Sequence, residues 1–252
     1  MESSAAGFVK RMYIMHVGKI EMPDVNGMMP GTREHGPASL PVYCYLLEHE
    51  KGRVLVDTGL KNEGLGVVGE GEDVVSQLAK MGLAPDDIDY VVLTHMHLDH
   101  AAFMDAFPSS TFVVRREELK TAWWPDHFER GYLFAHYAAT RDFAFIEPRD
   151  DEVVDLFGDG SVQLIDTRGH SRGHQSVLVT LGEGRRFVIA GDAAYFECNL
   201  EDWVLPGICT SSVDAERSIA KLRQLQGCGW KLLFGHDSGQ ESELRIAPDY
   251  YE

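Results

Sequence analysis

Short runs of apolar, β-branched and aromatic residues recur along most of the chain, separated by glycines and polar turns. Runs of about four to eight such residues predict β-strands. The expected strands cover residues 12–17, 42–47, 53–56, 90–93, 111–114, 162–165, 176–181, 187–190 and 231–234. Strands therefore dominate the predicted secondary structure.

Helical spacing of apolar residues is confined to two stretches. Residues 73–81 and 213–225 carry apolar positions three or four apart, and in the second stretch Val213, Ile219 and Leu222 share one face. Polar or glycine-rich turns at 49–52 and 182–184 predict two hairpins, one in each of two similar β-rich halves. Because no long linker or low-complexity tract interrupts the chain, we expect one layered domain over residues 1–252, with packed sheets and helices outside them.

Composition narrows the class of protein. The chain has 252 residues, of which 44% are hydrophobic and 25% are charged, and its net charge is −17. This is typical of a globular protein with a substantial core. Binding to phosphates depends on basic patches, so the acidic balance argues against nucleic-acid and anionic-membrane partners and favours small molecules.

The cysteines and the first residues of the chain indicate in which cellular compartment the protein is located. Four cysteines at positions 44, 198, 209 and 228 lie far apart without a CxxC pair, which predicts neither a disulfide framework nor a zinc ribbon. The first residues lack a signal-peptide pattern, and no run approaches the roughly 18 apolar residues that span a bilayer. We therefore expect a cytoplasmic location.

An aromatic segment stands apart from the strand pattern. Residues 123–137 carry two tryptophans and four other aromatic side chains: Trp123, Trp124, Phe128, Tyr132, Phe134 and Tyr137. The segment is interpreted either as a wall or cap that faces the substrate, or as core packing or a dimer contact. A homodimer is left open.

The main chemical signal follows the predicted strand 90–93. There an HxHxDH pattern places His95, His97, Asp99 and His100 within six residues. If this segment is extended, alternate side chains project to one side, so His95, His97 and Asp99 converge while His100 points elsewhere. Imidazole and carboxylate groups suit zinc, which is the default expectation, and also iron, cobalt, nickel or manganese.

Three more possible ligands each follow a predicted strand. His170 comes after 162–165, Asp192 after 187–190 and His236 after 231–234. Strand ends are where binding sites are assembled, so these positions extend the HxHxDH pattern. The sequence therefore predicts seven ligands, with two adjacent metal positions.

These motifs resemble the metallo-β-lactamase superfamily. The matching segments occur in the family's order: Val56-Asp57-Thr58-Gly59, His95 to His100, Gly169-His170-Ser171, Gly191-Asp192 and Gly235-His236-Asp237. The resemblance implies an α/β fold, a four-layer αββα sandwich of two mixed β-sheets with helices on the outer faces. It also implies a dinuclear site with no further cofactor: His95, His97 and His170 on one metal, Asp99, His100 and His236 on the other, and Asp192 bridging them.

Within that superfamily the chain is most similar to the N-acyl homoserine lactonases. Residues 41–48 and 169–176 carry the likeness, as does Tyr195, three residues after Asp192. In those enzymes this tyrosine lies beside the metals, and the resemblance implies contact with the lactone carbonyl or leaving oxygen. The chain departs from the family at Arg168 and Arg172, where proline is usual, and at Ala101-Ala102, where a glycine pair is usual. Such loop changes bear on substrate preference.

The resemblance implies a hydrolytic mechanism. Two divalent ions share a water, lower its pKa toward about 7 and so supply hydroxide. Tyr195 then stabilises the charge that develops on the carbonyl oxygen, and Asp99 serves as a ligand and as a proton carrier to the leaving alkoxide. The expected activity is lactone ring opening in N-acyl homoserine lactones, which degrades quorum-sensing signals.

Other functions and supporting residues stay open at this stage. The same ligands are also compatible with an enzyme that hydrolyses another lactone, such as a pyridoxolactone-like ring, or with a glyoxalase II-type thioesterase. A third alternative is a noncatalytic metal-binding protein that acts as a sensor or redox partner. His174 is expected to orient His170 or its loop, with a role as a further ligand as the alternative. Asp57 is expected to support a ligand, and Asp237 either orients an imidazole or caps a loop. An apolar groove for the acyl chain is expected from the aromatic segment together with Met22, Met28, Met29 and Phe107.

Overall fold

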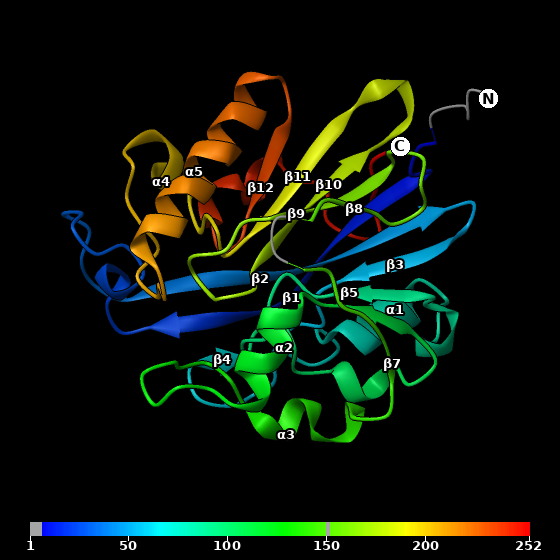
Figure 1. The fold of residues 1–252 in the computed structure, drawn as a ribbon, viewed down its shortest axis with the longest axis horizontal. Coiled ribbons are helices and arrows are strands. Elements are labelled where there is room, and N and C mark those ends of the chain that lie inside the picture. Colours follow the sequence, from blue (N-terminus) through cyan, green and yellow to red (C-terminus); the bar gives the residue numbers. More distant parts are fainter. Residues whose placement is uncertain (1–6, 150–151) are drawn as a thin grey trace.

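Two β-sheets lie face to face in the computed structural model, which describes residues 7–149 and 152–252 (Figure 1). The first sheet has seven strands in the order β4-β1-β2-β3-β5-β6-β7, and the second has five in the order β12-β11-β10-β9-β8. The strands of the first sheet are β1 (Arg11–Met22), β2 (Ala38–His49), β3 (Gly52–Val56), β4 (Gly66–Val67), β5 (Tyr90–Val92), β6 (Thr111–Val113) and β7 (Ala144–Ile146). Those of the second are β8 (Val154–Asp155), β9 (Val162–Asp166), β10 (Gln175–Thr180), β11 (Arg186–Gly191) and β12 (Lys231–Phe234).

Helices cover the outer face of each sheet. Figure 1 shows α4 and α5 beside the second sheet, and α1, α2 and α3 on the side of the first. Their bounds are α1 (Val74–Lys80), α2 (Arg116–Trp123), α3 (Phe134–Tyr137), α4 (Glu197–Glu201) and α5 (Ser212–Gly227). Short 3-10 turns are η1 (Val25–Gly27), η2 (Pro85–Asp87), η3 (Met104–Ala106), η4 (Ala138–Thr140), η5 (Gly182–Gly184) and η6 (Ser238–Glu243). The four-layer sandwich with two mixed sheets is confirmed.

Alternation along the strands explains the layers. In β2, Cys44 and Leu46 join the core between the first sheet and its helices, whereas Tyr45 and Leu47 join the core between the two sheets. Successive side chains of a strand point to opposite faces, so a strand that is apolar at every position is buried on both. A third cluster packs Leu200 of α4 and Leu222 of α5 on the outer face of the second sheet.

Strand direction brings the chemical residues to one region. Strand β3 pairs in parallel with β5, and β11 pairs in parallel with β12. Strand β9 runs antiparallel to β10, which runs antiparallel to β11, so β9 and β11 point the same way. The loops after β3, β5, β9, β11 and β12 carry Asp57, the HxHxDH motif, His170, Asp192 and His236 respectively. The fold therefore gathers these loops at the carboxyl ends of the strands, where ligand sites of α/β folds lie.

The nine strands and two helices expected from the sequence are all present, with ends that differ by a few residues. Strands β4, β7 and β8 and helices α2, α3 and α4 were not predicted, and each of them has eight or fewer residues. The second sheet lies wholly after the first in the sequence, as expected for two β-rich halves.

Candidate metal centre

The HxHxDH segment makes a turn after β5 instead of continuing as an extended strand. The backbone N–H groups of His100 and Ala101 both donate to the carbonyl oxygen of His97, at 3.0 Å each. The turn separates the motif into two pairs, His95 with His97 and Asp99 with His100. The expectation that His95, His97 and Asp99 converge while His100 points elsewhere was therefore wrong, because it assumed extended backbone.

Three imidazoles form the first group of possible ligands. Nε2 of His170 lies 3.1 Å from Nε2 of His95 and 2.8 Å from Nδ1 of His97. The other ring nitrogen of His170 lies 2.8 Å from the carbonyl oxygen of Ile208, to which it donates, so Nε2 carries the lone pair. Three ring nitrogens that face one another in a buried space suit a bound cation.

Two imidazoles and two carboxylates form the second group: Asp99, His100, Asp192 and His236. Nε2 of His100 lies 3.1 Å from Oδ1 of Asp192, and Nε2 of His236 lies 3.3 Å from the same oxygen. Among the described residues these three buried atoms have no hydrogen-bond partner. Buried polar atoms are normally satisfied, so orphaned atoms aimed at one point fit a metal ion.

Asp192 lies between the two groups. Its Oδ2 is 3.3 Å from Nε2 of His170 and 3.6 Å from Nε2 of His95, whereas its Oδ1 faces His100 and His236. One carboxylate with an oxygen toward each group is the geometry of a bridging ligand. Together the seven residues fit two metal ions.

Electrostatics differ between the groups. Burial is the main reason that the pKa of His97 falls to about 4 and that of His170 to about 3. Burial also lowers the pKa of His100, but the carboxylates of Asp192 and Asp99 outweigh it and raise that pKa well above its usual value. Burial raises the pKa of Asp99, but His100 outweighs it and brings the value to about 2. The carboxylates are therefore anionic and the first group is neutral at pH 7, whereas His100 is protonated beside its carboxylates and would give up that proton when a metal ion binds.

Asp57 at the end of β3 supports the second group. Its carboxylate accepts hydrogen bonds from the backbone N–H of Thr94 at 2.7 Å, from the Thr94 hydroxyl at 2.8 Å and from Nδ1 of His100 at 2.8 Å. The backbone of Asp57 has a φ of +60°, a strained conformation for a residue other than glycine. The bond to Nδ1 leaves Nε2 of His100 as the atom that faces the group.

His174 and Asp237 have roles that the structure separates from ligation. Nδ1 of His174 lies 2.9 Å from the Thr167 hydroxyl, and its Nε2 accepts the backbone N–H of Asp192 at 2.9 Å. His174 thus contacts the loop of His170, as expected, and it also positions Asp192. Asp237 accepts backbone N–H groups of Gly239 and Glu197 at 2.8 and 2.9 Å, so it caps loops.

Tyr195 is fully buried beside the first group. Its hydroxyl oxygen lies 2.9 Å from Nδ1 of His170. Burial, reinforced by Asp192, raises the pKa of Tyr195 well above its usual value, so the hydroxyl keeps its proton. Met28 and Met29 pack in one cluster with Tyr195, as expected for an apolar surface beside the site. Phe107 does not, because it is buried in the core between the first sheet and its helices.

The aromatic segment divides between two places. Tyr132 packs on His97 with ring centroids 4.6 Å apart, and the carbonyl of Gly131 accepts the backbone N–H of Leu98 at 2.8 Å. A Cβ atom on Gly131 would lie 2.9 Å from the His97 ring. We call residues 126–132 the covering loop, because this loop packs against His97.

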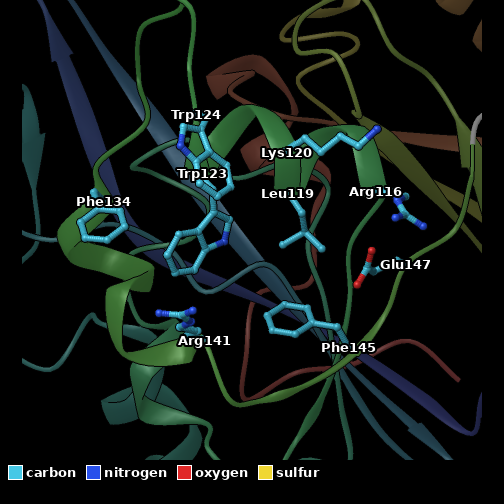
Figure 2. Close-up of a pocket in the computed structure, with 9 residues that line it drawn as sticks. All are labelled: Arg116, Leu119, Lys120, Trp123, Trp124, Phe134, Arg141, Phe145 and Glu147. Atoms are coloured by element: carbon cyan, nitrogen blue, oxygen red, sulfur yellow. The ribbon is translucent and has the colours of Figure 1, made fainter.

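Three of the other aromatic side chains of the segment lie at a separate cavity of about 650 Å³ (Figure 2). Trp123, Trp124 and Phe134 line it on one side, and Phe145 and Arg116 lie across from them. None of the seven possible ligands contributes to its lining. The segment therefore combines both interpretations: Tyr132 lies at the site, and Tyr137 is buried in the core.

Two contacts of the covering loop were not predicted. The buried carboxylate of Glu118 in α2 accepts a hydrogen bond from the Tyr132 hydroxyl at 2.9 Å. Arg172, in the His170 loop, donates to Asp126 at 2.8 Å and to Glu129 at 2.5 Å. The only signal for the second contact was that arginine replaces the proline usual at position 172.

Comparison with known proteins defines the class. Residues 38–236 match the metallo-beta-lactamase superfamily, and this range holds all seven possible ligands and both sheets' central strands. The chain belongs to the metallo-beta-lactamase superfamily. Within the described residues, no helix combines the length and apolar character needed to cross a membrane.

The similar relatives are lactonases. The chain is 31% identical to the N-acyl homoserine lactonase AttM of Azorhizobium caulinodans over 260 residues, covering 96% of this chain and 98% of that protein. It is 33% identical to the N-acyl homoserine lactonase AiiA of Bacillus thuringiensis subsp. kurstaki over 265 residues, covering 96% and 99%. A solved N-acyl homoserine lactone hydrolase, with the product N-hexanoyl-L-homoserine bound at its catalytic metal centre, superposes with a TM-score of 0.85 at 28% identity, covering 97% of this chain and 100% of that one.

Proposed function

We propose that the protein is a metal-dependent hydrolase that opens the lactone ring of N-acyl homoserine lactones and thereby degrades quorum-sensing signals. The observation that carries the proposal is the convergence of two ligand groups on Asp192, with the Tyr195 hydroxyl beside them. The lactonases AttM and AiiA, which match nearly the whole chain, support the choice of substrate.

The proposed ligands are those of the two groups. His95, His97 and His170 would hold one divalent ion, Asp99, His100 and His236 would hold the other, and Asp192 would bridge them. When bound, two such ions supply an activated water at neutral pH and polarise the carbonyl group. Zinc is the proposed metal because imidazole and carboxylate ligands suit it, and iron, cobalt, nickel and manganese are its competitors.

Two residues have proposed catalytic roles. Because the raised pKa keeps the proton on Tyr195, its hydroxyl donates a hydrogen bond to the lactone oxygen on which charge develops. Asp99 is anionic at pH 7 and is among the least buried of the ligands, so its carboxylate can take up a proton and pass it to the leaving alkoxide of the opened ring. His174 and Asp57 hold Asp192 and His100 in place.

Location and assembly form part of the proposal. A cytoplasmic location is consistent with the four cysteines, all of which are free thiols in the structure. A homodimer stays a prediction that the molar mass in solution will test.

Acid release decides the proposal. Metal-loaded protein is mixed with short-chain and long-chain N-acyl homoserine lactones in a pH-stat, with Asp192→Asn as the blank and a glutathione thioester in parallel. We expect rapid acid release from the lactones that the variant lacks. If only the thioester is hydrolysed, the protein is a thioesterase and the proposal fails. If neither compound is hydrolysed, the substrate is another lactone or the protein is not an enzyme.

A further inference from the structure

Glu118 is a buried carboxylate that lies outside both ligand groups. It is located in α2 with no exposed surface, and its two oxygens accept four hydrogen bonds. Oε1 accepts the backbone N–H of Met96 at 2.9 Å and the Tyr132 hydroxyl at 2.9 Å. Oε2 accepts the Ser171 hydroxyl at 2.7 Å and the backbone N–H of Gly173 at 3.0 Å.

These four donors belong to three separate parts of the chain. Met96 stands between His95 and His97, Ser171 follows His170, and Tyr132 packs on the His97 ring. One carboxylate therefore connects both loops that carry the first ligand group with the covering loop. None of these bonds reaches the loops of Asp192 or His236. Asp99 and His100 of the second group follow Met96 in the same loop, but they lie beyond the turn at His97.

Close packing reinforces this connection. A Cβ atom on Gly173 would lie 2.3 Å from the backbone nitrogen of Glu118, so the His170 loop approaches the backbone of α2 as closely as glycine permits. Helix α2 is thus the rigid element against which both loops are held. Ligand geometry set by such supporting groups commonly decides metal affinity.

We propose that Glu118 is a positioning residue for the metal ion held by His95, His97 and His170, and that it acts on this ion selectively. The inference rests on the proposed function only in requiring that this group binds a metal.

Glutamine cannot replace this carboxylate. Each oxygen of Glu118 faces one backbone N–H, from Met96 on one side and Gly173 on the other. A backbone N–H cannot reverse its direction, whereas the hydroxyls of Tyr132 and Ser171 can rotate. Either orientation of a glutamine amide therefore places an NH₂ group against a backbone N–H and removes at least one hydrogen bond.

The experiment measures binding of each metal ion without any lactone. Metal-free Glu118→Gln is titrated with Co²⁺ and then Zn²⁺, and the visible Co²⁺ spectrum, the number of ions bound and their dissociation constants are recorded. Glu117→Gln is the matched control, because Glu117 is the neighbouring residue in α2 and its partly exposed carboxylate pairs only with Lys120 among the described residues. Thermal melting of the metal-free proteins is measured in parallel.

We expect Glu118→Gln to bind one of its two ions about 10- to 100-fold more weakly, with an altered Co²⁺ spectrum, and to bind the other ion as Glu117→Gln does. Equal affinity of both ions in the two variants would overturn the proposal. So would an equal loss of both ions together with a lower melting temperature, because Glu118 would then support only the fold. Lactone turnover by the unaltered protein is a separate measurement, so the proposed substrate can fail without affecting this result.

Milder variants keep the test decisive if Glu118→Gln does not fold. Ser171→Ala and Tyr132→Phe each remove one hydroxyl donor and leave the backbone bonds in place. We expect Ser171→Ala to weaken the same single ion by a smaller factor. No change in either ion in both variants would count against the proposal.

Discussion

The two ligand groups of the metal centre are supported in different ways. In the group of His100 and His236, Asp57 binds an imidazole nitrogen of a ligand directly. In the group of His95, His97 and His170, Glu118 binds the backbone and hydroxyl groups next to the ligands. A direct contact sets the orientation of one ring, whereas a contact with the backbone sets the position of a whole loop. The two supports are separate residues and can be removed one at a time, although the Thr94 hydroxyl that bonds to Asp57 also lies 3.1 Å from Nδ1 of His95.

The groups also differ in charge. The first contains only imidazoles, whose pKa values are lowered by burial, and the second contains two carboxylates that counter this effect. The bridging carboxylate of Asp192 is the feature they share. Neutralising Asp192 should therefore weaken metal binding at both groups, whereas changing one support should weaken it at one group more than at the other.

The largest expected effect is that of Asp192→Asn. We expect kcat for lactone opening to fall by on the order of 10³ or more, because the change removes the ligand that both groups share. Metal analysis should show that the affinity for both ions falls. Asp105→Asn is the control, since this exposed carboxylate lies 3.9 Å from Nζ of Lys61 and belongs to neither ligand group. Full activity in Asp192→Asn would contradict the assignment of the bridge.

The next effect separates the groups. In the unaltered protein the Asp57 carboxylate accepts hydrogen bonds from Nδ1 of His100 and from the backbone N–H of Thr94. In Asp57→Asn the amide NH₂ group must face one of these two donors. In the first case His100 must move its proton to Nε2 and lose the lone pair that binds metal. We expect about 10- to 100-fold weaker binding of one ion. Comparison with Glu118→Gln checks this result: the Co²⁺ spectra should change differently, and identical changes would mean that the two supports act on the same ion.

Much of this centre could be predicted from the sequence, because its ligands are local motifs. Strand ends locate His170, Asp192 and His236 without any knowledge of packing, and the unbroken apolar run of residues 42–47 predicts a strand. The division of the HxHxDH motif was beyond that reasoning. It depends on the turn at His97, and the assumption of alternating side chains places Asp99 on the wrong side.

Glu118 illustrates a second limit of sequence reasoning. A glutamate in a short charged helix is normally exposed, and its neighbour Glu117 follows that expectation. Its burial arises from loops 22 and 53 residues away in sequence, which supply its hydrogen-bond donors. Short elements such as β8, with two residues, were missed for a similar reason. They form by pairing with a longer strand, and their own residues carry no periodic signal.

At Tyr195 we expect an effect on turnover without an effect on metal binding. Tyr195→Phe removes one hydrogen-bond donor and leaves the seven ligands in place, so we expect kcat to fall by about 10²-fold with little change in KM or in metal content. Tyr137→Phe is the control, because it removes a buried hydroxyl that donates to the backbone of Ala122 away from the site. A rise in KM alone would mean that Tyr195 binds the substrate without stabilising the developing charge.

The smallest effect concerns Arg172 and the covering loop. Its guanidinium pairs with Asp126 and with Glu129, and the Glu129 side chain is only 2% exposed. Because the loop packs on His97 of the first group, loosening it in Arg172→Ala should alter substrate binding at that group more than the chemistry. We expect KM to rise by about fivefold, which corresponds to about 1 kcal/mol, with kcat and metal content almost unchanged. Arg217→Ala removes an exposed pair with Asp214 and controls for lost charge. A fall in kcat without a change in KM would show instead that the loop, like Glu118, acts on the ligands.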